Sequence, residues 1–422
     1  MACDVRVPRR RPPRLLFCSY HCYWDPSSGA AVCSRELLEL LARRDWACRV
    51  LCGPRLDFEM PTRLDQILAA QQCEFELRQA AAAAGPLSVF RFRQAGVAVQ
   101  VYGSPFGPRL GPPTPEEGVG FLALCERVLE HFQPDVVLTY GGDWVTRELI
   151  GLAKERGIRV VFALHNLAYQ SGEPFRQVDA VLVPSRFAQA HYRRTIGLES
   201  TPIPGPWNWD RLRCESVEGR YVTFVNPQPQ KGVFLFARIA VELARRRPDI
   251  PLLVVEGRAT AKWLQATGLD LAALGNISVM ANTPDPRAFY RLSRIVLLPS
   301  LGSESFPRVP VEAFLNGIPV LANRIGGVPE VLEQAGFLFD VPQGYTPSTR
   351  QVPSAMEMAP WIETIIRLWD DPPFYAEESR RCRAAAEAWR PERLLPRFEE
   401  VLAPGMPAYK PEALAKGRAF LR

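Results

Sequence analysis

The chain has 422 residues, of which 47% are hydrophobic and 23% charged, which is typical of a soluble globular protein too long for one ordinary core. The net charge of +6 comes from 46 Arg and 5 Lys against 45 acidic residues, and this small excess without a nucleic-acid-binding motif argues against a nucleic-acid partner. No apolar run approaches the roughly 18 residues that cross a bilayer, and residues 1–13 lack the apolar segment of a secretory signal.

The arginines of the N-terminal tail and the cysteines bear on the compartment. Five arginines lie in or beside the tail: Arg6, Arg9, Arg10, Arg11 and Arg14. We expect a solvated tail, with weak contact to anionic lipid as the alternative. Several of the ten cysteines fall inside predicted elements, where small buried apolar residues belong: Cys18, Cys33, Cys48, Cys52 and Cys125. This usage indicates a reducing, cytoplasmic compartment, with the protein at most peripheral at the inner face of the membrane.

A zinc site is an alternative use of some of these cysteines. Its ligands would come from the region of the first two predicted strands: Cys18, His21, Cys22, Cys48 and Cys52. A structural zinc site needs four convergent ligands, and this spacing fits no common zinc module. We therefore expect buried thiols rather than metal ligands.

The first half of the chain alternates predicted strands with predicted helices. Strands are predicted at residues 15–20, 47–52, 135–140, 159–164 and 179–183. Helices are predicted at residues 29–44 and 61–84, and a hairpin at residues 89–102. Strands that alternate with helices predict a parallel, doubly wound sheet.

The second half repeats this pattern after a rigid junction. Residues 202–210, Pro-Ile-Pro-Gly-Pro-Trp-Asn-Trp-Asp, cannot form a core element and predict a domain boundary. Strands follow at residues 221–225, 251–256, 277–280, 294–298, 319–322 and 337–339, and then only helices from residue 355 to about 402. The predicted division is a basic proline-rich tail at residues 1–13, Rossmann-like domains at 14–205 and 206–375, and a helical segment at 376–422.

Two acidic residues, Glu304 and Glu312, lie between two predicted buried strands of the second domain. The first is in a loop and the second is in the early turns of a helix, so both are expected at the carboxyl edge of a parallel sheet, where open α/β sheets bind nucleotides and phosphates. Carboxylates for hydroxyls and backbone N–H groups for phosphates suit a phosphorylated sugar. The alternative is that both acids only complement a helix dipole.

This stretch, with Pro299-Ser300 before it and Gly326-Gly-Val-Pro-Glu330 after it, resembles the E-x7-E signature of the retaining glycosyltransferases of family 4. The resemblance implies the α/β GT-B architecture: two Rossmann-like, doubly wound domains facing a cleft, with C-terminal helices. It also implies that Glu312 holds the ribose of a donor nucleotide, that Glu304 faces the donor sugar, and that N–H groups near Ser305 and Phe306 line sugar and phosphate.

The residues expected to bind the diphosphate differ from the family pattern. The family places an Arg and a Lys five positions apart after the first strand of this domain, whereas this chain has Asn226 and Lys231. An Asn cannot replace the bidentate guanidinium clamp. Our hypothesis is that Arg258, in the loop after the next strand, supplies the missing cation; the alternative is a solvated loop charge.

Four residues of the first domain are further candidates. His165 directly follows a predicted strand, and the resemblance places it near the transferred sugar. Ser28 and Gly29 stand where the family has a glycine loop that approaches donor phosphate and acceptor. Asp143 also ends a strand and is a candidate for acceptor hydroxyls, with N-capping of the next helix as the simpler interpretation.

The resemblance implies transfer of a hexose-like sugar from a nucleotide-sugar donor to a glycan, lipid or small-molecule acceptor, in bacterial polysaccharide or glycolipid biosynthesis. The anomeric configuration would be retained by front-face departure of the diphosphate, with His165 and Glu304 as candidate catalytic residues. The chain has no Asp-x-Asp, so we expect no metal and no other cofactor, with Lys231 and a helix N-terminus stabilising the leaving group. Alternatives are another GT-B activity, such as a sugar-nucleotide epimerase or a phosphorylase, or a non-catalytic nucleotide-sugar-binding or scaffold protein.

Overall fold

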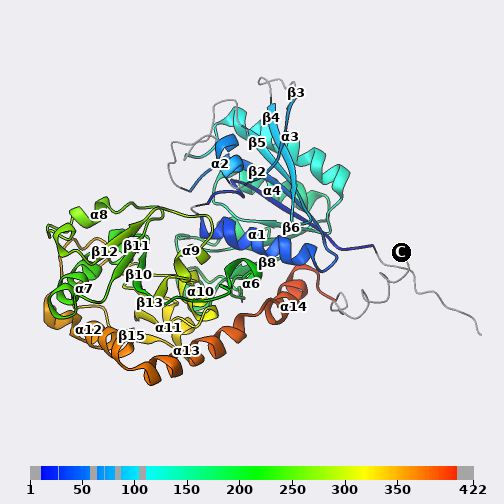
Figure 1. Ribbon diagram of the computed structural model, residues 1–422. Helices are drawn as coiled ribbons and strands as arrows, with labels where there is room; N and C mark the ends of the chain where they lie inside the picture. The colour runs from blue at the N-terminus through cyan, green and yellow to red at the C-terminus, as the bar shows by residue number, and fades with distance from the viewer. Residues whose placement is uncertain are drawn as a thin grey trace, which may run out of the picture. The chain divides into compact units, whose positions relative to one another are not determined.

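The computed structural model describes residues 11–26, 28–57, 64–70, 72–80, 87–103 and 111–405 (Figure 1). These residues divide into two compact units. The first lies within Met1–Ala163, Glu173–Val181 and Leu395–Arg422, and the second is Leu164–Gly172 with Leu182–Leu394. The loop that carries His165 therefore belongs with the second unit, although it precedes residue 205.

The first sheet has the strand order β3-β4-β5-β2-β1-β6-β7-β8-β9. Its strands are β1 (Arg14–His21), β2 (Ala47–Arg55), β3 (Glu76–Ala80), β4 (Leu87–Gln94), β5 (Val97–Gly103), β6 (Val136–Thr139), β7 (Arg159–Ala163), β8 (Ala180–Val183) and β9 (Thr201–Pro202). Strand β4 runs antiparallel to both β3 and β5, whereas β5, β2, β1, β6 and β7 pair in parallel. The carboxyl ends of β1, β2 and β6 consequently meet at one edge.

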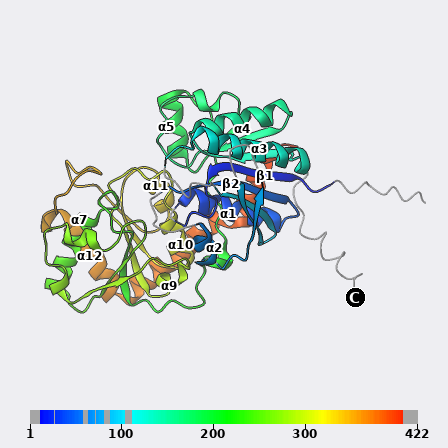
Figure 2. The same ribbon diagram turned by 90° about the horizontal axis from the view of Figure 1, so that it is seen from above.

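Helices cover both faces of this sheet. They are α1 (Gly29–Ala42), α2 (Leu64–Ala70), α3 (Pro115–Phe132) and α4 (Trp144–Glu155). Figure 2 shows α3 and α4 on one side of β1 and β2, and α1 on the other. Helix α3 begins with a capping box between Thr114 and Glu117, and its Phe121 packs edge-on against Tyr20 of β1.

The second sheet is parallel throughout, in the order β12-β11-β10-β13-β14-β15. Its strands are β10 (Tyr221–Val225), β11 (Leu252–Val255), β12 (Ile277–Met280), β13 (Ser293–Leu298), β14 (Val320–Asn323) and β15 (Phe337–Phe339). The helices after β7 are α5 (Arg186–Ile196), α6 (Trp209–Leu212), α7 (Val233–Arg246), α8 (Lys262–Gln265), α9 (Arg287–Tyr290), α10 (Arg308–Leu315), α11 (Val328–Leu332), α12 (Ala355–Asp370), α13 (Pro372–Ala386) and α14 (Pro391–Leu402). Short 3-10 turns lie at Glu173–Phe175, Pro229–Lys231, Ala272–Leu274 and Glu387–Trp389.

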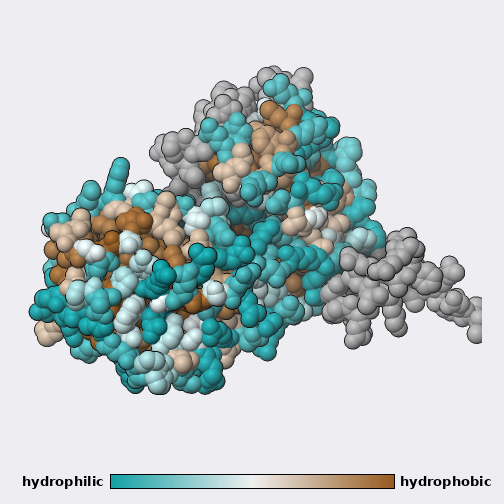
Figure 3. All heavy atoms as spheres, in the orientation of Figure 1, coloured by the Kyte–Doolittle hydropathy of each residue, from teal (hydrophilic) through white to brown (hydrophobic). Residues whose placement is uncertain are grey.

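Aromatic side chains fill the core of the second unit. Phe224 of β10 stacks on Phe236 of α7 with ring centroids 4.8 Å apart, and Phe339 of β15 stacks on Trp361 of α12 at 4.7 Å. Trp207, inside the predicted rigid junction, is 1% exposed. Strand β12 is one of the two edge strands of this sheet, and its Val279 is 53% exposed. Hydrophobic side chains gather on this part of the surface in Figure 3.

Most predicted elements are confirmed, including the hairpin, which turns at Ala95 and Gly96. The single helix predicted at residues 61–84 is wrong: α2 ends at Ala70, and Glu76–Ala80 pair antiparallel with β4 as strand β3. Pairing with an existing strand outweighs a weak helical preference. The alanines at 81–84 lie outside the described residues, as do Arg6, Arg9 and Arg10.

Among the helices that the structure describes, none combines the length and apolar character needed to cross a membrane.

Gly232, between the 3-10 turn and α7, is required by a close approach as well as by its backbone conformation. It has φ +86°, and a Cβ there would lie 1.9 Å from the carbonyl oxygen of Pro299. Gly275 has a similar φ of +72°, but nothing lies within 4 Å of a Cβ at that position. The two glycines differ only in what surrounds them.

We predict that Gly275→Ala lowers the free energy of unfolding by about 1–2 kcal/mol, the usual cost of a left-handed alanine. Gly232→Ala should lose about 1–3 kcal/mol more, because the loops at Lys231 and Pro299 must move apart. The measurement is urea unfolding of both variants and the wild type. Equal losses would contradict the close approach.

Candidate functional site

The loops after β10, β11, β13 and β14 leave the second sheet at its carboxyl edge, and backbone hydrogen bonds join the loop after β13 to the loops after β10 and β14. The amides of Leu301 and Gly302 donate to the carbonyl of Gln230 at 2.9 and 3.0 Å, so the loop after β13 is tied to the loop after β10. Open parallel sheets bind their ligands at this edge.

Lys231 and Glu304 form an ion pair across these two loops. Glu304 Oε1 accepts from Lys231 Nζ and, at 2.9 Å, from the Ser300 hydroxyl. The Glu304 side chain is 16% exposed and that of Lys231 is 28% exposed. The candidate catalytic acid and the candidate phosphate-binding cation are therefore adjacent and still reachable from solvent.

Two glycines after β14 support the backbone of Glu304 and Ser305. The amide of Gly327 donates to the Glu304 carbonyl at 2.7 Å. A Cβ on Gly326 would lie 2.4 Å from that carbonyl oxygen, and a Cβ on Gly327 would lie 2.3 Å from the Ser305 carbonyl oxygen. The Gly-Gly pair thus allows the E-x7-E loop to rest directly on its neighbour.

Glu312 is the fifth residue of α10, so the first turn of that helix contains no acid, and Glu304 lies four residues before the helix begins. The interpretation of both acids as partners of the helix dipole therefore does not hold. Glu312 is buried, and its carboxylate accepts from the Tyr290 hydroxyl at 3.0 Å and from Arg308 Nε at 3.1 Å. Burial, and next the Glu312 charge, raise the pKa of Tyr290, so Tyr290 stays a donor.

Asn226 has a structural reason to replace the family's arginine. It has φ +64°, in the left-handed region that Asn tolerates better than most side chains. Its Oδ1 accepts from the Ala259 amide at 3.0 Å, and a Cβ on Gly257 would lie 3.2 Å from its own Cβ. Asn226 thereby holds the loop after β11, and Arg258 is an exposed residue of that loop.

Ser305 joins the His165 loop to the N-terminus of α5. Its hydroxyl donates to the His165 carbonyl at 2.6 Å, and its own carbonyl accepts from the Ser185 hydroxyl at 2.6 Å. The buried Tyr192 of α5 donates to the Asn166 carbonyl at 2.8 Å. His165 is thus brought beside the Glu304–Ser305 loop through hydrogen bonds inside the second unit.

Glu330 of α11 completes this connection. Its carboxylate accepts from the backbone amides of Arg186 and Phe187 at 2.9 and 3.1 Å and from Arg186 Nε at 3.0 Å. These amides belong to the first turn of α5, where backbone donors have no partner inside the helix. Phe306, the remaining predicted donor-binding residue, packs against the buried Trp207 with ring centroids 5.8 Å apart.

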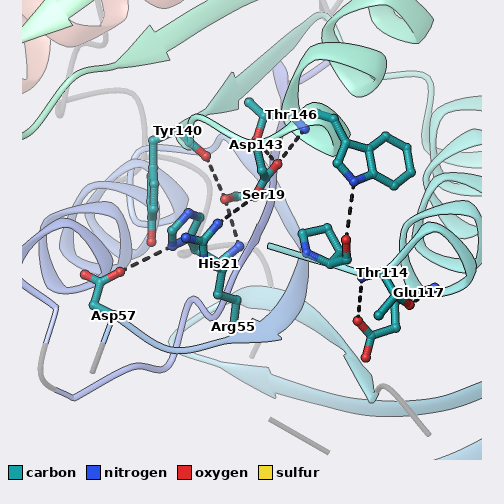
Figure 4. Close-up of polar contacts among 11 residues, drawn as sticks. Ser19, His21, Arg55, Asp57, Thr114, Glu117, Tyr140, Asp143 and Thr146 are labelled. Carbon is teal, nitrogen blue, oxygen red and sulfur yellow. Dashed lines mark hydrogen bonds and ion pairs between the residues drawn. The ribbon is translucent and has the colours of Figure 1, made fainter. Parts of the chain in front are cut away.

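Of the candidates in the first unit, Asp143 follows β6 and lies beside Arg55 and Thr146 at the carboxyl edge of the sheet (Figure 4). Asp143 caps α4: its Oδ1 accepts from the amide and hydroxyl of Thr146, both at 2.9 Å, and its Oδ2 pairs with Arg55 at 3.0 Å. The structure thus shows the N-cap that the simpler interpretation expects. Contact between Asp143 and acceptor hydroxyls stays a prediction. Ser28 caps α1 through the Ala31 amide, while Gly29 is exposed with open space around it.

His21, Arg55 and Asp57 also lie at this edge; none of the three is predicted from the sequence as an acceptor-site residue, and the sequence suggests His21 only as an alternative zinc ligand. His21 ends β1, and its Nδ1 lies 3.3 Å from Asp57 Oδ1. The His21 ring packs against Tyr140, whose pKa is raised first by burial and then by the Asp57 charge. His21 directly follows a predicted strand, as His165 does, so the rule that selected His165 would also have found His21.

Two pairs of free cysteines lie close together inside the first unit, Cys18 with Cys125 and Cys22 with Cys52. Cys18 and Cys125 have sulfurs 3.6 Å apart and are buried. This hydrogen bond, followed by burial, raises the pKa of Cys18; burial, followed by a hydrogen bond with Cys22, raises that of Cys52. Within the described ranges, no group of three His, Cys, Asp or Glu side chains is placed to hold a metal ion.

The fold defines a class: α/β proteins built from two Rossmann-like units, each with polar side chains at the carboxyl edge of its sheet. Models of two glycosyltransferase domains match the chain. "Glycosyl transferase 4-like domain" matches residues 28–204, and "Glycosyl transferases group 1" matches residues 218–357. The chain belongs to the family 4 glycosyltransferases, which have the GT-B fold.

Several curated relatives match part of the chain. D-inositol 3-phosphate glycosyltransferase of Arthrobacter sp. is 28% identical over 172 residues, 38% of this chain and 37% of the relative. Lipopolysaccharide 1,2-N-acetylglucosaminetransferase of Salmonella typhimurium is 28% identical over 209 residues, 44% of this chain and 53% of the relative. These matches thus span roughly a third to a half of the relatives.

Solved structures share the fold over nearly their full length. HepE of Anabaena, solved with UDP and glucose, has a TM-score of 0.62 at 16% identity, covering 93% of this chain and 99% of HepE. Sucrose-phosphate synthase of Thermosynechococcus elongatus has a TM-score of 0.60 at 16% identity, covering 92% and 98%.

We predict that Glu330→Ala exposes the amides of Arg186 and Phe187 to faster hydrogen exchange, because hydrogen bonds to a charged acceptor contribute about 1.5–3 kcal/mol, or at least about tenfold in exchange rate. Glu333→Ala is the matched control, since this neighbouring carboxylate reaches only the Arg186 side chain, at 3.5 Å. The readout is amide exchange resolved by residue. Equal rates in the two variants would show that Glu330 does not hold α5.

Proposed function

We propose that this protein transfers a sugar from a nucleotide-sugar donor to an acceptor, with retention of the anomeric configuration and without a metal ion. The observation that carries the proposal is the ion pair between Lys231, after β10, and Glu304, in the loop that the Gly326–Gly327 backbone supports. A cation for the diphosphate and a carboxylate for sugar hydroxyls lie within one ion pair. A donor phosphate would compete with Glu304 for Lys231 and leave the carboxylate for the sugar.

The remaining residues receive roles from their positions. Glu312 would hold the ribose, with Tyr290 and Arg308 orienting its carboxylate. The amides near Ser305 and Phe306 would line the sugar and phosphate. His165, whose loop is fastened to Ser305, would act beside the transferred sugar together with Glu304.

The acceptor would bind the first unit, at the edge that carries Ser28, Gly29 and Asp143 together with His21. The named activities of the curated relatives, on inositol phosphate and on lipopolysaccharide, support a role in glycolipid or polysaccharide biosynthesis. A lipid-linked acceptor would make the protein peripheral to a membrane.

A non-catalytic nucleotide-sugar-binding protein is the second candidate, because one specific observation favours it. Asn226 replaces the diphosphate-binding Arg, and its side chain is used by the Ala259 amide. Binding of UDP or another nucleotide without turnover on a pool of glycan, lipid and small-molecule acceptors would support this candidate. Formation of a glycosylated product, rather than an epimerised nucleotide sugar, would support transfer.

We predict that Glu312→Ala weakens binding of the nucleotide sugar at least about tenfold, because two charge-assisted hydrogen bonds to the ribose are lost. The ligand is first found by screening nucleotides and nucleotide sugars for a rise in melting temperature, and its Kd is then measured by calorimetry. Tyr290→Phe is the control, since it removes one hydrogen bond to Glu312 but keeps the carboxylate. Unchanged affinity in folded Glu312→Ala would refute the ribose role.

We also predict that Arg258→Ala weakens binding of the same donor about tenfold, by removing a cation that compensates for Asn226. Lys262→Ala, which removes another exposed cation four residues further on, should leave the Kd unchanged. The expected effect disappears for the nucleoside without phosphate. An equal Kd for the nucleotide sugar in Arg258→Ala and in the wild type would refute the hypothesis that Arg258 compensates for Asn226.

A further inference from the structure

Four arginines gather on one face of the first sheet, away from its carboxyl edge. The strand register places Arg49 of β2, Ala98 of β5 and Arg93 of β4 in one row. Arg91 lies two residues from Arg93 on the same strand, and Arg14 lies two residues from Leu16, which pairs with Arg49. Because side chains alternate between the two faces of a sheet, all four arginines share a face.

Helix α3 covers this face only in part. Its Cys125 and Phe121 pack on β1, but the helix ends at Phe132. The guanidinium of Arg49 lies 4.7 Å from the centroid of the Phe132 ring, and that of Arg14 lies 5.9 Å from it. Arg49 and Arg14 are therefore half-buried at the end of α3, whereas Arg93 is exposed.

Glu76 of β3 lies opposite Arg91 and so shares this face with the four arginines, as does Arg78. In the part of the chain that the structure describes, none of the four arginines forms an ion pair with a carboxylate. Arg14 and Arg93 donate to the backbone carbonyls of Phe132 and Gly96 at 2.9 and 3.2 Å, and Arg91 Nε is buried without a hydrogen-bond partner. Glu76 pairs across the strands with Arg91, but its carboxylate binds Arg78.

The neighbouring charges and burial change the pKa of Arg49. Burial, and then repulsion from Arg93, Arg91 and Arg14, lower the pKa of Arg49. Like charges on neighbouring strands destabilise a sheet. The position of Arg14 is explained by α3, because the Arg14 side chain donates to the carbonyl of Phe132, the last residue of that helix. The helix does not explain why two arginines lie on β4.

The arrangement suits a compact dianion. Arg49 and Arg93 lie two strand spacings apart, about 10 Å between backbones, and only the small Ala98 stands between them. Arginine side chains are long enough to converge over that gap, and their guanidinium groups bind phosphate oxygens in pairs. A carboxylate would neutralise less of the charge than a phosphate monoester does.

We propose that Arg49, Arg91 and Arg93, with Arg14 beside them, form a binding site for a phosphate monoester at the amino-terminal end of the first sheet. Arg49 is the third residue of β2 and Arg55 its last, so the site lies about 20 Å along the strand from the carboxyl edge. It is separate from Lys231 and independent of the proposed transferase activity. The phosphate belongs either to a soluble ester or to a lipid headgroup.

The test uses the full chain and inorganic phosphate. Potassium phosphate should raise the melting temperature by a few degrees over potassium chloride at equal ionic strength, because a ligand that binds only the folded state stabilises it. Arg49→Gln and Arg93→Gln should abolish this increment, while Arg246→Gln, at an exposed arginine of α7, should keep it. In chloride alone, Arg93→Gln should melt at the same or a higher temperature, because one repelling charge is gone.

Two further measurements assign the phosphate. Lys231→Ala must retain the increment; if it alone removes the increment, phosphate binds the donor site and the proposal is overturned. Sedimentation with phosphatidylcholine vesicles that contain phosphatidic acid identifies the source: binding that Arg49→Gln and Arg93→Gln remove indicates a lipid headgroup, and phosphate binding without vesicle binding indicates a soluble ester. A phosphate increment of wild-type size in both arginine variants, or none in the wild type, would refute the site.

Discussion

The ion pair between Lys231 and Glu304 is the interaction on which the candidate site depends. It joins loops from β10 and β13, which are 73 residues apart in sequence but adjacent in the sheet. Glycine makes the approach possible twice: at Gly232, against the backbone of Pro299, and at Gly326 and Gly327, against Glu304 and Ser305. Side chains at these positions would push the loops apart. The ion pair therefore depends on the close backbone contact that the glycines allow.

The same E-x7-E loop also reaches the segment that carries His165. Ser305 uses its hydroxyl for the His165 carbonyl and its carbonyl for Ser185, and Glu330 binds the first amides of α5. These hydrogen bonds explain why residues 164–172 belong with the second unit although the strand before them belongs with the first. A histidine in the first half of the chain thereby becomes part of the site around Glu304.

The two sheets each carry polar groups at their carboxyl edges, but they use them differently. In the second unit the pair Lys231 and Glu304 remains partly exposed, whereas in the first unit Asp143 is committed to capping α4 and to Arg55. His21 and Asp57 are the accessible polar pair beside Asp143. The second edge therefore presents a lysine–carboxylate pair and the first a histidine–carboxylate pair.

The sequence by itself determined the alternation of strands and helices, the parallel sheets, the E-x7-E loop and the glycines beside it, because hydrophobic periodicity and turn residues are local signals. Tertiary structure decided what local signals do not contain. Strand β3 formed where a helix was predicted, because β4 supplied backbone partners. Asn226 fits its position through its left-handed backbone and its hydrogen bond with the Ala259 amide, and His21 is a candidate site residue only because it lies beside Asp57. Each of these outcomes depends on a partner distant in sequence, and no local pattern specifies which partner that is.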